Sequence, residues 1–451
     1  MRKSIAATGF YLILLLCPLL PAAQTAPPST VDINQRIVDL EQQLQQLKAQ
    51  VAAQGNAQAP AVTPATSSNA VAVATAPAAA PGPLDGIASV LKGATVTGLV
   101  DTYYGYNFNQ PKSRVSGLRL FDQRTNQFAL NLVELGVVKT PDVTSRLGYN
   151  ITFGFGDAMN IVNASDPSFM QYLKEAYLSY MAKIGKGLQI DFGKFVTPVG
   201  AEVIESNLNL NYSRGLLFNY AIPFYHFGGR AKYTFNGKVA VTGYLVNGWN
   251  DIVHDSNPLN NSVNGNTALI PIANNYTNSG KTGGLSFAWT PNKKVSLTET
   301  WFGGPGATPA DGDNWRNLSD TVVTFTPNAK LTLTANGDYG RSQKPLGFTH
   351  AVDWSGIAGY AKYQYTPLWA LAGRYEYYND HTGFTTSTAQ HINEVTGTLE
   401  RKFVQHLVSR FEYRFDDSNQ KFFQKGASRL ANTQQTVMAG LIFVLEPDAA
   451  K

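Results

Sequence analysis

The stretch Leu407 to Asp416, LVSRFEYRFD, alternates between two kinds of side chain along its length. One face would carry Leu407, Ser409, Phe411, Tyr413 and Phe415, and the other Val408, Arg410, Glu412, Arg414 and Asp416. A period of two residues is typical of a β-strand, because successive side chains point to opposite faces of a sheet. We therefore predict a strand with one largely apolar face and one charged face.

The same alternation recurs at several other places between residues 95 and 445. Clear examples are Arg146 to Phe155, Lys330 to Tyr339 and Trp369 to Tyr377. Alternation alone fits a soluble β-sandwich as well as a transmembrane barrel. The choice between these folds rests on the N-terminal leader, the scarcity of cysteine and the number of strands.

The N-terminus has the pattern of an export signal. Arg2 and Lys3 precede the short apolar stretch Phe10 to Leu20, so residues 1–26 are predicted to be a signal peptide. The single cysteine, Cys17, lies in this leader, and a mature chain without cysteine is typical of exported bacterial proteins. No later stretch is apolar for long enough to form a spanning helix. A membrane protein without such helices requires a closed barrel, because lipid offers no partner to an open sheet edge.

The composition agrees with a barrel whose outer surface meets lipid. Charged residues make up 15% of the chain, against about 25% in soluble domains. Aromatic residues make up 12%, which suits a lipid-facing wall. The net charge of +5 does not indicate nucleic-acid binding, because the basic residues are scattered among acidic ones.

Turn signals give the strand count. Short turns are predicted at Thr140-Pro141, Gly185 to Gly187, Asn236-Gly237, Thr290-Pro291, Thr326-Pro327, Thr366-Pro367 and Arg401 to Gln405. The prolines are expected in tight turns, and Asn236-Gly237 predicts a turn of the primed type. Long polar stretches separate these turns. Seven short turns and eight long connections predict about sixteen strands over residues 95–451, with fourteen or eighteen left open and both ends in the periplasm.

Two segments precede the predicted barrel. Residues 27–53 place apolar side chains at heptad spacing, namely Ile33, Ile37, Leu40, Leu44, Leu47 and Val51. This seam predicts a short coiled coil for self-association, although a solitary surface helix is the alternative, and the seam does not itself select a trimer. Residues 54–94 are rich in Ala and Pro and predict a flexible linker in the periplasm.

One part of the predicted barrel resembles a known family. The run begins with FGKFVTPVGAE, Phe192 to Glu202, and continues with Tyr212 to Tyr220. Two strands are expected after Phe192 to Glu202, and the second of them ends with Asn247 to Asn250. This run is similar to that of the OmpL-like β-barrel porins, a family of outer-membrane proteins. The resemblance covers roughly the barrel region. It implies a porin of a Gram-negative outer membrane and a homo-oligomer, in particular a trimer, but no particular solute.

Candidate site residues follow from this arrangement. Val199 to Tyr225 contains too many apolar residues for a solvated loop, so we expect it to fold into the barrel, with a plain extracellular loop as the alternative. Pore-lining or constriction candidates are Glu202, Glu205, Arg214, Arg146, Arg230, Lys232, Arg374, Glu376, Arg410, Glu412 and Arg414. Such charges would tune ion preference, weakly toward anions, or would only form ion pairs that stabilise the wall.

Catalysis has little support. The six histidines form no helical metal pair, and the chain has neither a nucleophile elbow nor a phosphate loop, so no catalytic, metal or cofactor site is predicted. We expect passive diffusion of small hydrophilic solutes and ions. A solute-specific channel and a structural barrel without an open pore remain alternatives. Outer-membrane lipid, other copies of the chain and the cell wall are the expected partners, and nucleic acid is not.

Overall fold

The computed structural model describes residues 90–445, except residues 165, 167, 251–279, 306–313, 346 and 405. The predicted signal peptide, the coiled-coil seam from Ile33 to Val51 and nearly all of the predicted linker lie outside the described residues.

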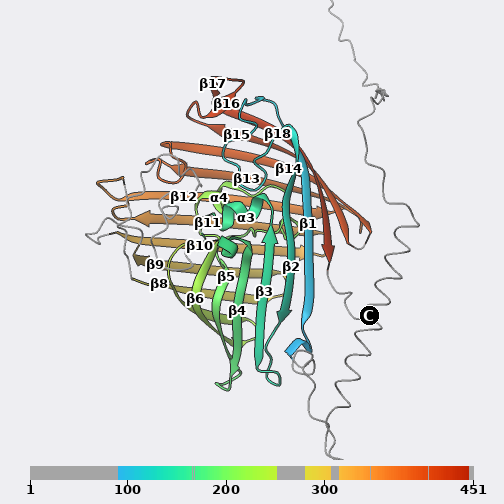
Figure 1. The fold of residues 1–451 in the computed structure, drawn as a ribbon, viewed down its shortest axis with the longest axis vertical. Coiled ribbons are helices and arrows are strands. Elements are labelled where there is room, and N and C mark those ends of the chain that lie inside the picture. The colour runs from blue at the N-terminus through green and yellow to red at the C-terminus, as the bar shows by residue number, and fades with distance from the viewer. Residues whose placement is uncertain are drawn as a thin grey trace, which may run out of the picture. The chain divides into compact units, whose positions relative to one another are not determined.

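Sixteen antiparallel strands form one closed barrel, as predicted (Figure 1). The strands are β1 (Thr95–Asn107), β2 (Gln127–Lys139), β3 (Leu147–Phe155), β4 (Leu173–Ala182), β5 (Leu188–Val196), β6 (Tyr225–Asn236), β7 (Val239–Val246), β8 (Thr282–Asn292), β9 (Val295–Pro305), β10 (Trp315–Asn328), β11 (Leu331–Ser342), β12 (Val352–Gln364), β13 (Trp369–Asp380), β14 (Gln390–Val404), β15 (Leu407–Ser418) and β18 (Thr433–Leu445). Each strand pairs with its neighbours in the chain. The two remaining strands, β16 (Phe423–Lys425) and β17 (Arg429–Ala431), form a small hairpin in the last long connection.

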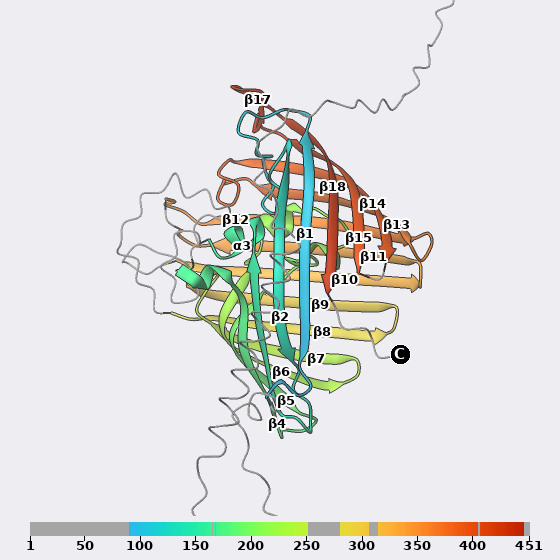
Figure 2. The same cartoon turned by 45° about the vertical axis from the view of Figure 1, so that its right-hand side comes forward.

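Pairing of the first strand with the last closes the ring. β1 runs antiparallel to β18, from Gly98 opposite Leu445 to Asn107 opposite Thr436. Figure 2 shows the two strands side by side. Closure leaves no unpaired sheet edge, which is the condition for a β-structure in lipid. The start of β1 and the end of β18 both lie on the side of the short turns, as an even number of strands predicts.

The predicted alternation sets the two faces of the wall. In β15, Arg410, Glu412 and Arg414 are buried inside the barrel, whereas the side chains of Phe411 and Tyr413 on the outside are 56% and 41% exposed. The other strands that show the pattern behave in the same way. The apolar face therefore meets the membrane and the polar face meets the interior.

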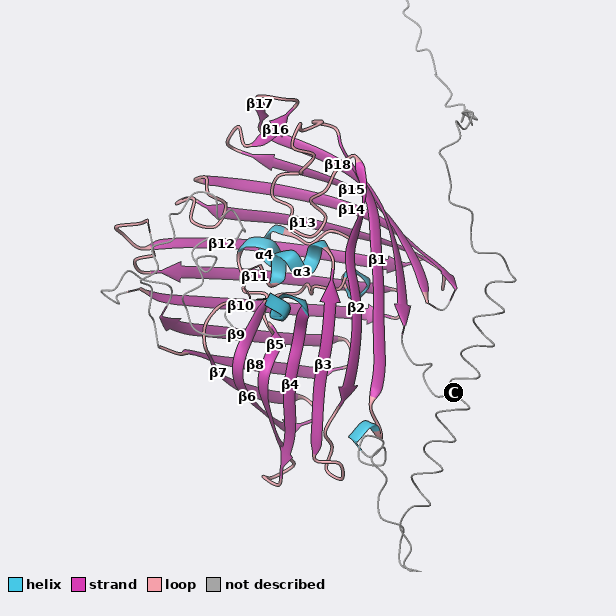
Figure 3. Ribbon diagram, viewed as in Figure 1, coloured by secondary structure: helices cyan, strands magenta, loops and turns pink. Residues whose placement is uncertain are grey.

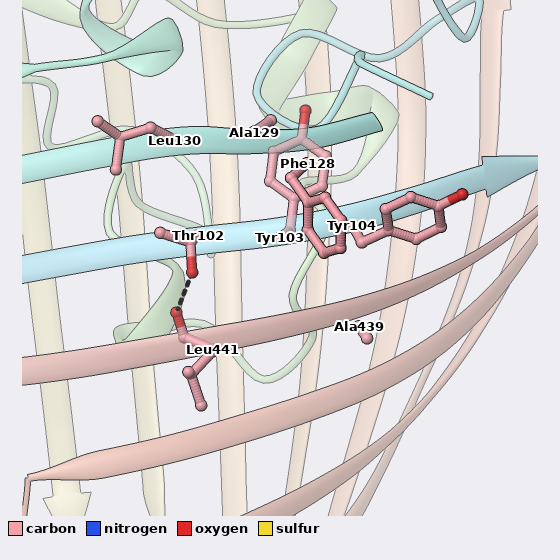
Figure 4. A pocket seen from close by; sticks show the side chains of 8 residues that line it. All are labelled: Thr102, Tyr103, Tyr104, Phe128, Ala129, Leu130, Ala439 and Leu441. Atoms are coloured by element: carbon pink, nitrogen blue, oxygen red, sulfur yellow. Dashed lines mark hydrogen bonds between the residues drawn. The ribbon is translucent and has the colours of Figure 1, made fainter. Parts of the chain in front are cut away.

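The outer wall has a shallow apolar groove where the ring closes (Figure 4). The ring centres of Tyr104 and Phe128 lie 4.9 Å apart beside it. The Thr102 hydroxyl donates a hydrogen bond to the backbone oxygen of Leu441 at 3.3 Å. Phe128 is 86% exposed. The groove therefore belongs to the lipid-facing surface and not to the interior.

Glu299 is an exception to the apolar outer wall. It pairs with Thr321 of β10, and its neighbour Thr300 pairs with the inward-facing Asp320, so Glu299 points outward. Its carboxylate accepts hydrogen bonds from the hydroxyls of Ser319, at 2.7 Å, and Thr321. These bonds reduce the cost of an outward carboxylate within the strand region.

The short turns lie where they are predicted, but two are built differently. Pro291 and Pro327 lie inside β8 and β10, next to irregularities in strand pairing, and not in the turns themselves. The following asparagines make the turns. The Asn292 side chain accepts a hydrogen bond from the N–H of Lys294 at 2.8 Å. In the same way, the Asn328 side chain accepts one from the N–H of Lys330. A short amide side chain can satisfy the backbone of a turn in this way.

The prediction of a primed turn at Asn236-Gly237 is wrong. Neither residue has a positive φ, which a type I′ turn requires. Instead, the Asn236 side chain accepts the N–H groups of Lys238 and Val239 at 2.8 and 3.0 Å. A pairing irregularity next to Asn236 supplies the extra bend, so a left-handed conformation is not needed.

The described helices are short and lie in the long connections. They are α3 (Asp157–Val162), η1 (Ser168–Tyr172), η2 (Ser206–Leu208) and α4 (Leu216–Tyr220). Figure 3 shows α3 and α4 within the ring of strands. Among the described residues, no helix is both long enough and apolar enough to cross a membrane.

Phe411→Arg tests which face of β15 meets lipid. A basic side chain at the lipid face costs about 2–4 kcal/mol, so this variant should unfold at lower urea concentration in lipid bilayers. Thr332→Arg is the control, because Thr332 is half-buried and faces the interior. Equal loss of stability in the two variants would contradict the assignment of the faces.

Candidate functional site in the barrel interior

Residues 197–224, which connect β5 to β6, run inside the barrel, and we call them the infolded segment. Its side chains are mostly buried, and Tyr212, Leu216 and Ala221 are 0% exposed. Leu208 is an exception at 63%. In Figure 1, α4 of this segment lies among the strands of the ring. A chain segment inside a barrel must find partners for its own backbone groups, and strands on several sides provide them.

The start of the segment binds the wall at two neighbouring strands. The N–H of Gly200 donates to Asp320 of β10 at 3.1 Å, and the N–H of Ala201 donates to Asn336 of β11 at 3.1 Å. Asn336 in turn donates to Asp320 at 2.6 Å. These side chains face inward because the strands alternate, so the wall presents acceptors where the segment presents donors.

Arg374 of β13 joins the segment to two carboxylates. Its guanidinium contacts Glu202 of the segment at 2.7 Å and Glu394 of β14 at 2.8 Å. It also donates to the backbone oxygen of Ser213 at 2.7 Å. All the charged groups are buried. A buried guanidinium with this many acceptors is a strong positional constraint, because its removal would leave the buried Glu202 without its cation.

Two further wall carboxylates accept backbone N–H groups of the segment. Glu412 accepts from Tyr212 at 2.7 Å and from Ser213 at 3.1 Å. Glu376 accepts from Leu216 at 2.5 Å. A Cβ at the adjacent Gly215 would lie 2.1 Å from a carboxylate oxygen of Glu376, so a larger residue there would displace this acceptor.

Arginines of β15 bind the carbonyl groups of the segment. Arg410 donates to the backbone oxygens of Asn209 and Asn211, each at 2.8 Å, and pairs with Glu400 at 2.7 Å. Arg414 donates to the backbone oxygen of Arg214 at 2.8 Å. The wall therefore satisfies donors of the segment with carboxylates and its acceptors with guanidinium groups.

Strands β1 and β4, on the other side of β18 in the ring, hold the same segment. Asp101 of β1 accepts hydrogen bonds from the hydroxyls of Ser206 and Tyr212, both at 2.7 Å. Lys174 of β4 pairs with Glu205 of the segment. Burial alone would raise the pKa of the Glu205 carboxyl, but Lys174 holds that pKa below its ordinary value. The segment is thus held from β1 and β4 as well as from β10 to β15.

Most of the eleven predicted site residues meet at these contacts. The buried ones are Glu202, Arg214, Arg374, Glu376, Arg410, Glu412 and Arg414. Glu205 joins them through Lys174. Arg146 lies apart, near the short turns, where it donates to the backbone oxygen of Met181 at 2.8 Å. In this structure the buried charges hold the segment against the wall.

Arg230 and Lys232 lie on the inner face of β6, away from these contacts. Arg230 pairs with Asp191 at 2.7 Å, and its guanidinium lies 4.5 Å from the ring centre of Phe195. Lys232 is two residues further toward the short turn and is exposed. Of the predicted charged residues, Lys232 is therefore the one that is most open to solvent in the interior.

The first long connection also folds inward, which sequence reasoning missed. Phe121 is fully buried, and its ring centre lies 5.6 Å from those of Phe218 and Phe224. Arg119 and Asp122 form a buried ion pair beside it. Burial alone would raise the pKa of the Asp122 carboxyl, but Arg119 holds that pKa below its ordinary value. The apolar residues Leu118, Leu120 and Phe121 in an otherwise polar connection were the available signal.

The interior differs between its two ends. Toward the long connections, inward residues of β6 to β10 such as His226, Phe302 and Leu318 are buried. Toward the short turns, inward residues such as Thr298 and Thr324 are half-buried. Solvent therefore reaches the wall from the short-turn end. Within the described residues, no group of three or more potential metal-ligating side chains occurs.

Arg374→Met tests whether the ion pairs hold the infolded segment. Loss of the guanidinium leaves Glu202 buried without its cation and leaves Glu394 with Arg414 alone, at a cost of about 3–5 kcal/mol. Amide hydrogen exchange in residues 202–217 should accelerate. Arg401→Met is the matched control, since Arg401 is exposed at the outer wall near the short turns and stacks on Trp369. Unchanged exchange in Arg374→Met would show that other contacts suffice.

Comparison with solved structures places this fold among outer-membrane porins. The anion-selective porin from Comamonas acidovorans aligns with 10% identity and a TM-score of 0.53, over 78% of this chain and 99% of that one. The trimer form of in-vitro folded OmpT from Vibrio cholerae aligns with 13% identity and a TM-score of 0.51, over 78% and 99%. OmpF from Salmonella typhi, in a complex with daunomycin, gives 10% and 0.51, over 78% and 97%. At these identities the likeness concerns the fold.

The family comparison agrees with the resemblance noted from the sequence. No curated protein matches the chain. Residues 93–445 match the family model described as "Putative beta-barrel porin-2, OmpL-like", which spans all sixteen strands of the barrel. The chain is therefore a member of the OmpL-like family of outer-membrane β-barrel porins.

Proposed function

We propose that this outer-membrane porin allows passive diffusion of small hydrophilic solutes and ions. The observation that carries the proposal is the solvent-accessible polar wall inside the short-turn half of the barrel. A closed ring of sixteen strands is wide enough to leave an aqueous lumen, whereas side chains fill a ring of about eight.

The infolded segment would set the narrowest part of the passage. Its contacts with β1, β4 and β10 to β15 leave the inner faces of β5 to β9 as the wall opposite. Because buried side chains of the wall hold its backbone by hydrogen bonds, the segment should keep its position during passage. A rigid constriction selects by size, which is the behaviour of a diffusion channel and not of a transporter.

A weak preference for anions is the expected selectivity. Most interior charged side chains form buried ion pairs, so they contribute little net electrostatic field to the passage. Lys232 is exposed on the inner face of β6 next to the paired Arg230. A fixed cation in the lumen attracts anions and repels cations, and this effect weakens as salt rises.

A structural barrel without an open pore is the competing function. The dense contacts around the segment favour it, because they fill much of the interior. The half-buried threonines toward the short turns favour a channel, because a sealed barrel has no need of a wetted polar wall. We therefore retain diffusion as the primary proposal.

Lys232→Glu in planar bilayers tests this function. The unmodified protein should conduct in steps in KCl, and the variant should shift the zero-current potential toward cation preference. Lys293→Glu is the control, because Lys293 is exposed at the tip of the turn between β8 and β9. Absence of step currents from the unmodified protein would refute the channel, and equal shifts in both variants would refute the role of Lys232.

The N-terminal segment is proposed to lie in the periplasm. Both ends of the barrel are on the short-turn side, which faces the periplasm in bacterial outer-membrane barrels. On whole cells, a cysteine replacing Lys425 in the last long connection should react with an impermeant maleimide. A cysteine replacing Lys293 should not, and the reverse labelling would overturn this orientation.

The protein is proposed to act as an oligomer, in particular a trimer. The outward Glu299 supports a protein-covered patch on the wall, since lipid solvates a carboxylate poorly. The predicted seam from Ile33 to Val51 would be an accessory contact that tethers the barrels near the cell wall. Light scattering in detergent should give trimers for the full mature chain and for a chain that begins near Pro83. Monomers in both cases would refute the oligomer, and monomers after truncation alone would assign assembly to the seam.

A further inference from the structure

The inner wall of β7 to β11 carries several hydroxyl groups, and its carboxylates Asp320 and Asp338 are buried. Pairing aligns these groups in two rows. Thr242 of β7 lies opposite Ser286 of β8, which lies opposite Thr300 of β9. A second row lies nearer the short turns, beyond the row of Ala288, Thr298 and Val322. It runs over β9, β10 and β11 and consists of Ser296, Thr324 and Thr334. We call these six residues the hydroxyl wall.

The row nearest the short turns is the accessible one. Ser296, Thr324 and Thr334 are half-buried, and the hydroxyls of Thr324 and Thr334 lie 3.2 Å apart. In the other row, Thr300 is buried and donates to Ser286 at 3.0 Å. The row of Ser296, Thr324 and Thr334 thus meets water. Its hydroxyl groups have remaining capacity to donate and accept hydrogen bonds.

The charges of the interior are used elsewhere. Arg374, Arg410 and Arg414 are each paired with buried carboxylates and with the backbone of the infolded segment. Few fixed charges are therefore left to meet a solute on this side of the barrel. The groups offered to a solute along β9 to β11 are neutral and can act as both donor and acceptor.

We infer that the hydroxyl wall recognises uncharged, hydroxyl-rich solutes of the size of a sugar, and that it lowers the barrier to their passage. This inference rests on the proposed channel and specifies its substrate class. A hydroxyl group matches another hydroxyl in either direction, so a row of them can replace the water around a polyol step by step. An ion gains less, because its hydration is replaced well only by opposite charge or by many oriented dipoles.

The test is a triple variant in which Ser296→Ala, Thr324→Val and Thr334→Val remove the three accessible hydroxyls with little change in volume. Ser296→Thr, Thr324→Ser and Thr334→Ser form the control, which keeps all three. Swelling of liposomes in arabinose and step conductance in KCl are measured for both and for the unmodified protein. Urea unfolding in the same lipid verifies that each variant is folded.

The inference predicts that hydroxyl removal slows arabinose-driven swelling by roughly threefold or more, the effect of one lost hydrogen bond of ordinary strength. KCl conductance should stay close to that of the control. Equal loss of swelling and conductance would overturn the inference, because the change would then be one of pore size. Unchanged swelling would overturn it as well. If the unmodified protein passes neither arabinose nor KCl, the channel itself is refuted.

Discussion

Every backbone N–H and C=O group within a membrane must be hydrogen-bonded to the protein itself, and this requirement determines the rest of the structure. The ring satisfies it by pairing β1 with β18, so that the first and last strands leave no edge. Once the backbone is paired, side chains alone decide which face meets lipid. The alternation in β15 then follows, with Phe411 outside and Arg410 inside.

Closure of sixteen strands creates a second requirement. The ring is too wide for its own side chains to fill. The infolded segment occupies part of this space, but apart from the short η2 and α4 it brings irregular backbone to the depth of the membrane. Such backbone is tolerated only where protein or water satisfies it. The wall does so with Glu412 and Glu376 toward N–H groups and with Arg410 toward carbonyl groups. The charged inner face therefore mainly binds the segment, and the proposed passage would be lined by neutral polar side chains and Lys232.

The barrel was predictable from the sequence because its determinants are local. A two-residue period in β15 fixes both faces, and turn residues separate the strands. Details that depend on tertiary context were not predictable. Asn236-Gly237 has the composition of a primed turn, yet a pairing irregularity and the Asn236 side chain produce another geometry. The inward path of Leu118 to Phe121 was likewise missed, because its apolar partners Phe218 and Phe224 are distant in the chain.

The roles of the charged residues show the same limit. Sequence alone identified Arg374 and Glu202 as inward or constricting charges, but could not show that they meet each other at 2.7 Å. The proposed channel requires water-filled space beside the segment. Single-channel conductance in the presence of polyethylene glycols of increasing size measures whether such space exists. Small polymers should enter it and reduce the conductance, and polymers above a sharp size limit should not. Absence of step currents, or a conductance that polymers of every size leave unchanged, would contradict the proposed channel.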